Sequence, residues 1–160
     1  MNAASVKEIK TTLEQMPSTE LAELCMRLIK FKKENKELAT YLLFDAYDES
    51  GYVANVKAAL LLLFEEVNRT NLYFAKKTLR KIVRVAGKYI KYSNSETTET
   101  DLLLFVAETM LGLGLPLHKS TALQNIYTGI IKKIKKSVAS LHEDLQYDYL
   151  RQLTSIDPDN

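Results

Sequence analysis

Apolar residues recur at three- and four-residue steps along most of this chain. Residues 18–31 show the pattern clearly, because Leu24 and Cys25 lie three and four residues after Leu21, and Leu28 lies four and three residues after them. Such spacing places apolar side chains on one face of an α-helix. No run of residues alternates between apolar and polar positions in the way that strands joined by hairpin turns do. Because only 5 Gly and 3 Pro interrupt 160 residues, the sequence predicts an all-α protein.

Capping and breaking residues indicate where the helices begin and end. Ser5 and Glu8 have the spacing of a capping box, and Pro17 ends the helix that they open. Ser140 and Glu143 repeat that spacing before the last helix. Helices are expected at about 5–16, from 18 to the polar run at 32–36, and from that run to 47. Further helices are expected at about 53–68, 72–92, 101–113 and 120–138, and a last one begins at 140.

Two polar stretches, 48–51 and 93–100, are expected to be connecting segments. The helices number seven or eight, because the polar run at 32–36 either separates two helices or bridges one long helix. Together they predict a single domain over residues 1–156, followed by a polar tail at 157–160. The helix at 53–68 is apolar almost all round, which favours a central position in the fold.

A short pattern suggests an internal repeat. The residues Leu61–Phe64 read Leu-Leu-Leu-Phe, and the same four letters return at Leu102–Phe105. Each block is followed by a basic helix with one interior glycine, Gly87 or Gly129. A period of roughly 40 residues with two antiparallel helices per unit is the dimension of HEAT-like repeats. The alternative is coincidence among leucine-rich helices, so we expect either a short HEAT-like α-α superhelix or an irregular helical bundle.

The charges are nearly balanced overall but segregated along the chain. Against 22 Lys and Arg stand 20 Asp and Glu, a net charge of +2, yet residues 67–95 and 109–142 contain no acid. At 100° per residue the bases of helix 72–92 fall within an arc of about 140°. Those bases are Lys76, Lys77, Arg80, Lys81, Arg84, Lys88 and Lys91. On helix 120–138, Lys132, Lys133, Lys135 and Lys136 share one sector.

A run of charge is usually a solvated helix face, and acids of adjacent elements can neutralise it. Segregation is harder to explain in that way, because like charges one turn apart repel by roughly 0.2–0.5 kcal/mol per pair. If the two basic helices share one layer, their bases form a strip of the kind that binds phosphate backbones. The residues predicted to bind a polyanion are Lys76, Lys77, Arg80, Lys81, Arg84, Lys88, Lys91, Lys132, Lys133 and Lys136.

Other chemistry finds no support in the sequence. Cys25 has apolar neighbours and is expected to be a small buried hydrophobe. His118 and His142 have no second histidine at ligand spacing, and Glu65–Glu66 lacks the Glu-x-x-His partner of a di-iron bundle. We therefore expect no enzyme, no cofactor and no metal. Without a signal-peptide core or an apolar run of ~20 residues, the sequence predicts a cytoplasmic protein with no membrane partner.

The order of several segments resembles an uncharacterised family of small all-helical bacterial proteins, known only as a domain of unknown function. The likeness rests on Val6-Lys7-Glu8-Ile9, on Glu20-Leu21-x-Glu23-Leu24, on Asn35-Lys36-Glu37, on Phe74-Ala75-Lys76-Lys77 and on Asp101-Leu102-Leu103-Leu104. It implies a compact helical fold in a bacterial cytoplasm and supplies no activity or site residue.

The function is not fixed by the sequence, and two interpretations remain. Good packing signals without catalytic residues favour a non-enzymatic helical module that binds another protein. The alternative is nucleic-acid or other polyanion binding through the basic faces of helices 72–92 and 120–138. The sequence leaves the oligomeric state open.

Overall fold

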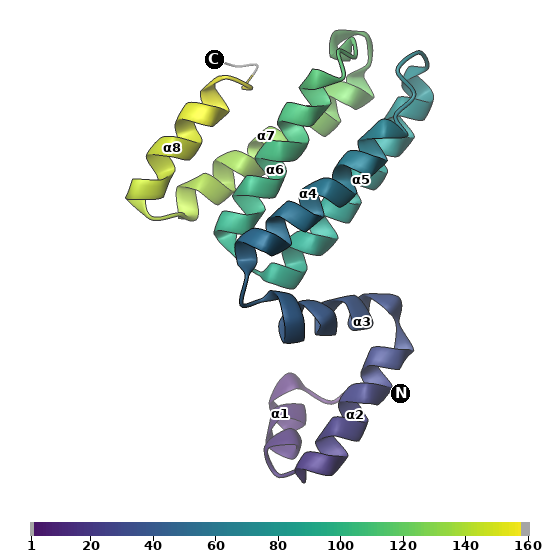
Figure 1. Ribbon diagram of the computed structural model, residues 1–160, viewed down its shortest axis with the longest axis vertical. Helices are drawn as coiled ribbons and strands as arrows, with labels where there is room; N and C mark the ends of the chain where they lie inside the picture. The colour runs from purple at the N-terminus through teal and green to yellow at the C-terminus, as the bar shows by residue number, and fades with distance from the viewer. Residues whose placement is uncertain (1, 158–160) are drawn as a thin grey trace. The chain divides into compact units, whose positions relative to one another are not determined.

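The computed structural model describes residues 2–157, and over this range it contains eight α-helices and no strand (Figure 1). The prediction of an all-α protein is confirmed. The helices are α1 (Val6–Glu14), α2 (Ser18–Phe31), α3 (Lys33–Thr40), α4 (Glu49–Glu65), α5 (Leu72–Ser93), α6 (Glu96–Gly112), α7 (Thr121–Ser140) and α8 (Glu143–Thr154). A π-helical turn, Tyr41–Asp45, follows α3, and a 3₁₀ turn, Leu117–Lys119, precedes α7.

The chain divides into two compact units after Phe44. The N-terminal unit contains α1 to α3, and the C-terminal unit contains α4 to α8. Because two compact units can still belong to one domain, the single domain expected over residues 1–156 stays a prediction.

The N-terminal unit contains several local polar contacts. The Ser5 backbone N–H donates to the Glu8 carboxylate at 2.8 Å, and the Glu8 N–H donates to the Ser5 hydroxyl at 3.3 Å, which confirms the predicted capping box. The hydroxyl of Ser5, together with its backbone N–H, holds the pKa of Glu8 below its usual range. The Asn35 side-chain amide donates to the Leu28 carbonyl at 2.7 Å and so joins α3 to α2.

The three helices of this unit contain no buried residue. The expectation that Cys25 is buried is therefore wrong, because its side chain is exposed. Periodicity showed which residues share the face of α2, but it did not show whether a neighbour covers that face.

The C-terminal unit is built around α6, which packs against α4, α5, α7 and α8. Its side chains are buried on nearly every side, including Leu102, Val106, Ala107 and Met110. The central position expected for helix 53–68 is therefore wrong. That segment corresponds to α4, which contacts α5 and α6 and leaves Leu62 64% exposed.

Two helices begin earlier than the sequence predicts. At the start of α4, the Asp48 carboxylate accepts the Gly51 N–H at 3.0 Å, which holds the pKa of Asp48 below its usual range. At the start of α6, the Ser95 hydroxyl accepts the Thr98 N–H at 3.3 Å. The segments at 48–51 and 93–100, which were expected to connect helices, are therefore helical over most of their length. Asp48 and Ser95 are short polar residues that cap the N-terminus of a helix, so the polar residues here mark helix starts and not only a loop.

The last helix also begins at a different residue. Ser140 belongs to α7 and donates its hydroxyl to the Ser137 carbonyl at 2.7 Å, so it does not cap α8. The N-cap of α8 is His142, whose Nδ1 accepts the Asp144 N–H at 3.4 Å. The capping-box spacing of Ser140 and Glu143 was thus a coincidence.

Buried polar groups connect the helices of the C-terminal unit. The Glu49 carboxylate of α4 accepts hydrogen bonds from the hydroxyls of Ser93 and Thr98. The hydroxyls of Thr100 and Ser137 lie 2.6 Å apart and join α6 to α7. Each contact satisfies a polar atom that would be costly to bury alone. Since α6 carries two of these hydroxyls, the polar beginning of this helix belongs to the core.

The C-terminal end of the described chain is anchored through α8. The Tyr149 hydroxyl donates to the Asp101 carboxylate at 2.9 Å, and the Tyr127 hydroxyl donates to the Ile156 carbonyl. Asp157 is buried and pairs with Lys135 at 2.5 Å. Asp157, the first residue of the polar tail expected at 157–160, is therefore held against α7, whereas residues 158–160 of that expected tail lie outside the described residues.

One buried and one exposed leucine from the two Leu-Leu-Leu-Phe blocks provide a test of this packing. Leu102 is fully buried and Leu62 lies on the outer face of α4. We expect Leu102→Ala to lower the free energy of unfolding by about 2–5 kcal/mol, because it leaves a cavity in the core. Leu62→Ala should change it by less than about 1 kcal/mol. Urea unfolding followed by circular dichroism measures both, and equal losses would contradict the central placement of α6.

The two buried tyrosines predict a loss of stability at high pH. Burial, with smaller effects from Asp157 and Glu108, raises the pKa of Tyr127 to about 12. Burial and the hydrogen bond to Asp101 raise the pKa of Tyr149 to about 12. An unfolded tyrosine titrates near 10, so the contribution is fully present below pH ~10 and is lost as the pH rises toward ~12.

We expect the two rings together to contribute on the order of 2–4 kcal/mol to this loss. Thermal unfolding at pH values from 8 to about 12 measures it, with tyrosinate absorbance as a direct readout of titration. The variant Tyr127→Phe/Tyr149→Phe should show a flatter pH dependence, because it has no ring hydroxyl to ionise at these positions. A pH dependence identical to that of the wild type would contradict the assignment.

Candidate anion-binding surface

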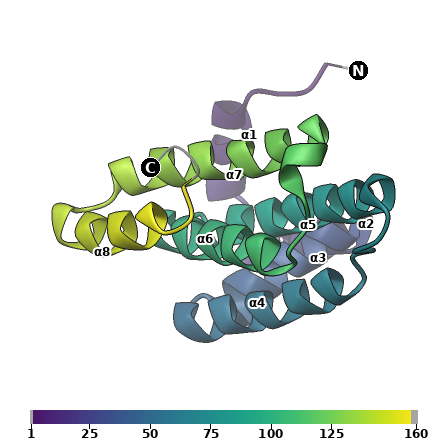
Figure 2. The ribbon, with the colours of Figure 1, turned by 90° about the horizontal axis from the view of Figure 1, so that it is seen from above.

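The two basic helices lie against each other in the C-terminal unit. Both α5 and α7 pack on α6, and α5 also contacts α7 directly, as Figure 2 shows from above. Helices from two acid-free stretches of sequence are thereby brought side by side. The positions of the individual bases decide how much positive charge this contact gathers.

The lysines of α7 divide between two sides of the helix. Lys133 and Lys136 face α5 and line a cleft between the two helices. Lys135 points to the other side, where it pairs with Asp157. Lys132 is exposed and lies outside the cleft. At 100° per residue, positions 133 and 136 lie on the same side of a helix and position 135 lies away from them, which explains the division.

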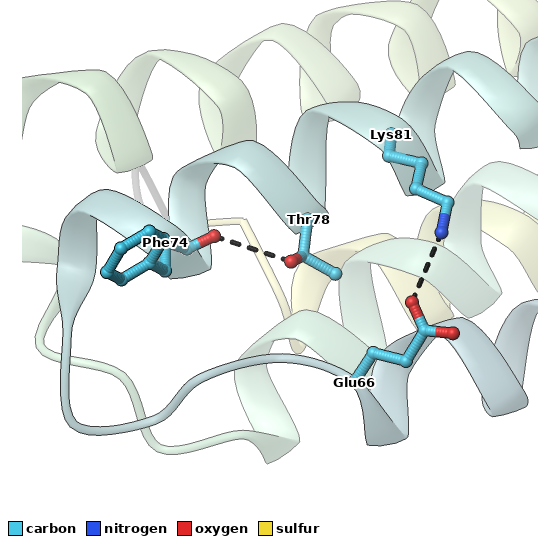
Figure 3. Close-up of polar contacts among 4 residues, drawn as sticks. All are labelled: Glu66, Phe74, Thr78 and Lys81. Atoms are coloured by element: carbon cyan, nitrogen blue, oxygen red, sulfur yellow. Dashed lines mark hydrogen bonds and ion pairs between the residues drawn. The ribbon is translucent and has the colours of Figure 1, made fainter.

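The bases of α5 divide in a similar way. Lys91 lines the cleft. Lys81 lies toward the end of α4, where its ammonium group pairs with the Glu66 carboxylate at 3.1 Å (Figure 3). The ammonium group of Lys88 lies 5.1 Å from the ring centre of Tyr89. These three bases of one arc therefore have three different environments.

The remaining bases of α5 lie nearer its beginning. Lys76 and Lys77 place their ammonium groups 4.9 and 4.6 Å from the ring centre of Tyr73. Arg80 and Arg84 are exposed. Over residues 2–157, none of these four bases forms an ion pair with a carboxylate. They continue the basic surface along α5, outside the cleft.

The cleft has a volume of about 700 Å³ and three walls. Lys91 belongs to the α5 wall, and Lys133 and Lys136 belong to the α7 wall. The third wall is the beginning of α6, where Glu96 and Glu99 contribute carboxylates. Within the described residues, no ion pair joins the three lysines to these carboxylates. The cleft thus presents charges of both signs, with the bases in excess.

Sequence reasoning missed the α6 wall because it assigned residues 93–100 to a connecting segment. Ser95 was the signal that could have revealed it, since a serine followed directly by an acidic residue is typical of a helix N-terminus. The sequence also grouped all ten predicted bases as one site. The structure brings Lys91, Lys133 and Lys136 together at the cleft and leaves the other seven outside it.

Comparison with known proteins provides no relative from which a function could be transferred, because no family model, curated protein or solved structure matches the chain. In the described part of the chain, no three His, Cys, Asp or Glu side chains are grouped so that they could hold a metal ion. Residues 2–157 also contain no helix with both the length and the apolar character needed to cross a membrane.

Proposed function

We propose that the protein binds a polyanion, with nucleic acid as the principal candidate, through the basic surface of α5 and α7. The observation that carries this proposal is the direct packing of α5 against α7. Each helix comes from an acid-free stretch, so their contact concentrates positive charge that a net charge of +2 conceals. A concentrated positive surface attracts phosphate groups and releases their condensed counterions.

The absence of carboxylate partners along α5 supports the proposal. Lys76, Arg80 and Arg84 follow one another at one-turn spacing, and like charges at this spacing destabilise a helix slightly. Over residues 2–157 none of the three forms an ion pair that would relieve the repulsion. A bound anionic chain would relieve it, because its phosphates would supply the missing negative charge.

The dimensions of α5 suit an extended ligand. From Lys76 to Lys91 the helix advances by roughly 22 Å at 1.5 Å per residue. One nucleic-acid strand places a phosphate about every 3.4 Å along a duplex axis, so several phosphates fit along this distance. We therefore propose an elongated binding surface that runs along α5 and reaches α7 at the cleft.

The repeat-like arrangement belongs to the same proposal. The Leu-Leu-Leu-Phe blocks lie in α4 and α6, and each is followed by a basic helix, α5 or α7. This order supports the view that α4–α5 and α6–α7 are two antiparallel, HEAT-like helix pairs. In such an arrangement the second helices of both pairs share one layer. We further propose a bacterial cytoplasmic setting, as the family resemblance implies.

The polyanion proposal predicts binding that weakens steeply with salt. A labelled single-stranded oligonucleotide should bind with a log–log salt slope of roughly −0.7 per phosphate contacted. The variant Arg80→Glu/Arg84→Glu should lower its affinity by at least about tenfold and reduce the steepness of the slope by roughly 1–2 units. Fluorescence anisotropy at several salt concentrations measures both quantities.

The matched control reverses two exposed lysines of the N-terminal unit, Lys7→Glu/Lys36→Glu, and changes the net charge by the same amount. It should bind almost as the wild type does if the site lies on α5. Equal losses in the two variants would mean that only overall charge matters, and this result would reject the proposed surface.

A second candidate function rests on the outer face of α4. Ala54, Ala58, Leu61 and Leu62 lie together on this face and are exposed, although they are apolar. Exposed apolar faces of this kind are typical of protein-interaction surfaces. This observation favours the non-enzymatic protein-binding module that the sequence suggested, with the apolar face of another protein as the partner.

The second candidate predicts a face-specific loss of binding. The variant Leu61→Asp/Leu62→Asp should lose a protein that the wild type retains from extracts of its native cells, because two carboxylates cannot be desolvated in an apolar interface. The variant Lys7→Glu/Lys36→Glu should retain the same protein. If the wild type and both variants retain the same partner protein, the α4 face is not the interface.

A further inference from the structure

The cleft between α5, α6 and α7 contains two kinds of polar group on different walls. Three ammonium groups, those of Lys91, Lys133 and Lys136, come from α5 and α7. The carboxylates of Glu96 and Glu99 come from α6. A surface that binds phosphates through charge alone gains nothing from carboxylates beside its lysines. The combination instead suits a ligand that has both an anionic group and hydrogen-bond donors.

Gly87 keeps the α5 wall of this cleft open. It lies inside a 22-residue helix, where glycine is less favourable than alanine by roughly 1 kcal/mol. A Cβ atom built at this position meets no atom within 4 Å, so close packing does not require glycine here. Its backbone φ is not positive either, because the only positive-φ glycine among the described residues is Gly114. The space in front of Gly87 is the cleft itself.

The α7 side shows a related feature. Gly129 lies one helical turn before Lys133, and a Cβ atom at Gly129 also meets no atom within 4 Å. Residues four apart share one side of a helix, so this second open position lies on the lysine side of α7. Each of the two basic helices therefore contains an interior glycine at which a Cβ atom would meet no neighbour.

The remaining lining of the cleft is partly apolar. Val83 and Leu103 contribute apolar surface, and the buried hydroxyl of Ser137 lies on the α7 wall. The volume of about 700 Å³ falls within the range of small-molecule sites, which is ~300–1,000 Å³. A flat ring could lie against the apolar surface next to Gly87, with its polar groups directed to the charged walls.

We propose that the cleft holds one nucleotide unit. The phosphate lies at the lysines of α5 and α7, where ammonium groups supply charge-assisted hydrogen bonds. The carboxylates of Glu96 and Glu99 accept hydrogen bonds from ribose hydroxyls or base amino groups, since an ionised carboxylate can only accept. The base lies on the apolar surface beside Gly87. Inorganic polyphosphate has no donor groups and no ring, so it cannot use the α6 wall.

This inference rests on the proposed binding of polyanions and adds which polyanion the surface prefers. The nucleotide unit has two possible sources, a segment of a nucleic-acid strand or a free mononucleotide. Both have the same phosphate, sugar and base, so the cleft chemistry is common to them. The experiment below distinguishes the two sources, and it separates failure of this inference from failure of the general proposal.

The test compares the full-length protein with Gly87→Met and Gly87→Ala. Methionine is a good helix former that would fill the cleft, whereas alanine adds a single methyl group and serves as the control for the change in helix propensity. Two probes are used, a labelled single-stranded oligoribonucleotide and inorganic polyphosphate of similar charge. Thermal unfolding confirms that each variant is folded.

We expect Gly87→Met to weaken oligoribonucleotide binding by on the order of tenfold, while polyphosphate binding changes by less than about twofold. Gly87→Ala should bind the oligoribonucleotide more nearly as the wild type does. The variant Glu99→Ala should weaken oligoribonucleotide binding and leave polyphosphate binding unchanged or stronger, because it removes both an acceptor and a repulsive charge.

Equal effects of Gly87→Met on the two probes, or no effect on either, would overturn the nucleotide assignment and leave the general polyanion proposal standing. If the wild type binds neither probe, the nucleotide assignment and the general polyanion proposal are both overturned. Adenosine monophosphate, added as a competitor, shows whether the nucleotide unit comes from a strand or from a free mononucleotide. If it displaces the oligoribonucleotide, the cleft accepts a free nucleotide, and if it does not, the cleft takes a nucleotide only as part of a strand.

Discussion

The arrangement of the C-terminal unit depends on the burial of α6. This helix contacts the other four helices of the unit, and its apolar residues are covered on nearly every side. Such burial would be unfavourable if the polar beginning of the helix had no partners. Thr98 donates to Glu49 of α4, and Thr100 contacts Ser137 of α7, so both hydroxyls are satisfied inside the core. The same contacts fix how α4 and α7 pack on α6.

The charge pattern of the surface follows from this packing. Because α5 and α7 both cover α6, their remaining faces point to solvent, and three bases of these faces, Lys91, Lys133 and Lys136, line one cleft. The beginning of α6 contributes two carboxylates at the same place. One buried helix thus positions both the positive walls and the negative wall. A binding surface with mixed charge can distinguish ligands by hydrogen bonding as well as by total charge.

The sequence predicted the helical fold because its periodicity and caps are local properties. The Ser5–Glu8 capping box and the segment forming α5 needed no information from distant residues. The central helix could not be predicted in that way, since Leu61 and Leu102 both begin the same four-residue pattern, yet Leu61 is exposed and Leu102 is fully buried. Ser95 and Thr98 were read as a connecting segment because polar residues suggest exposure, whereas here their hydroxyls cap a helix and enter the core.

The candidate site was only partly predictable for a related reason. A helical projection shows that Lys133, Lys135 and Lys136 share one broad sector, but it does not show where neighbouring helices divide that sector. In α7 the sector is divided between the cleft beside α5 and the segment that follows α8. Tyr127 donates to the Ile156 carbonyl and Lys135 pairs with Asp157, so one side of α7 holds the segment that follows α8.

The rotation of α7 about its own axis is set by its buried apolar side chains, which pack on α6. With Lys135 held toward Asp157, the helix geometry directs Lys133 and Lys136 toward α5, where they line the cleft. The lysines of α7 that look equivalent in sequence therefore have different environments, because Lys135 pairs with Asp157 whereas Lys133 and Lys136 line the cleft.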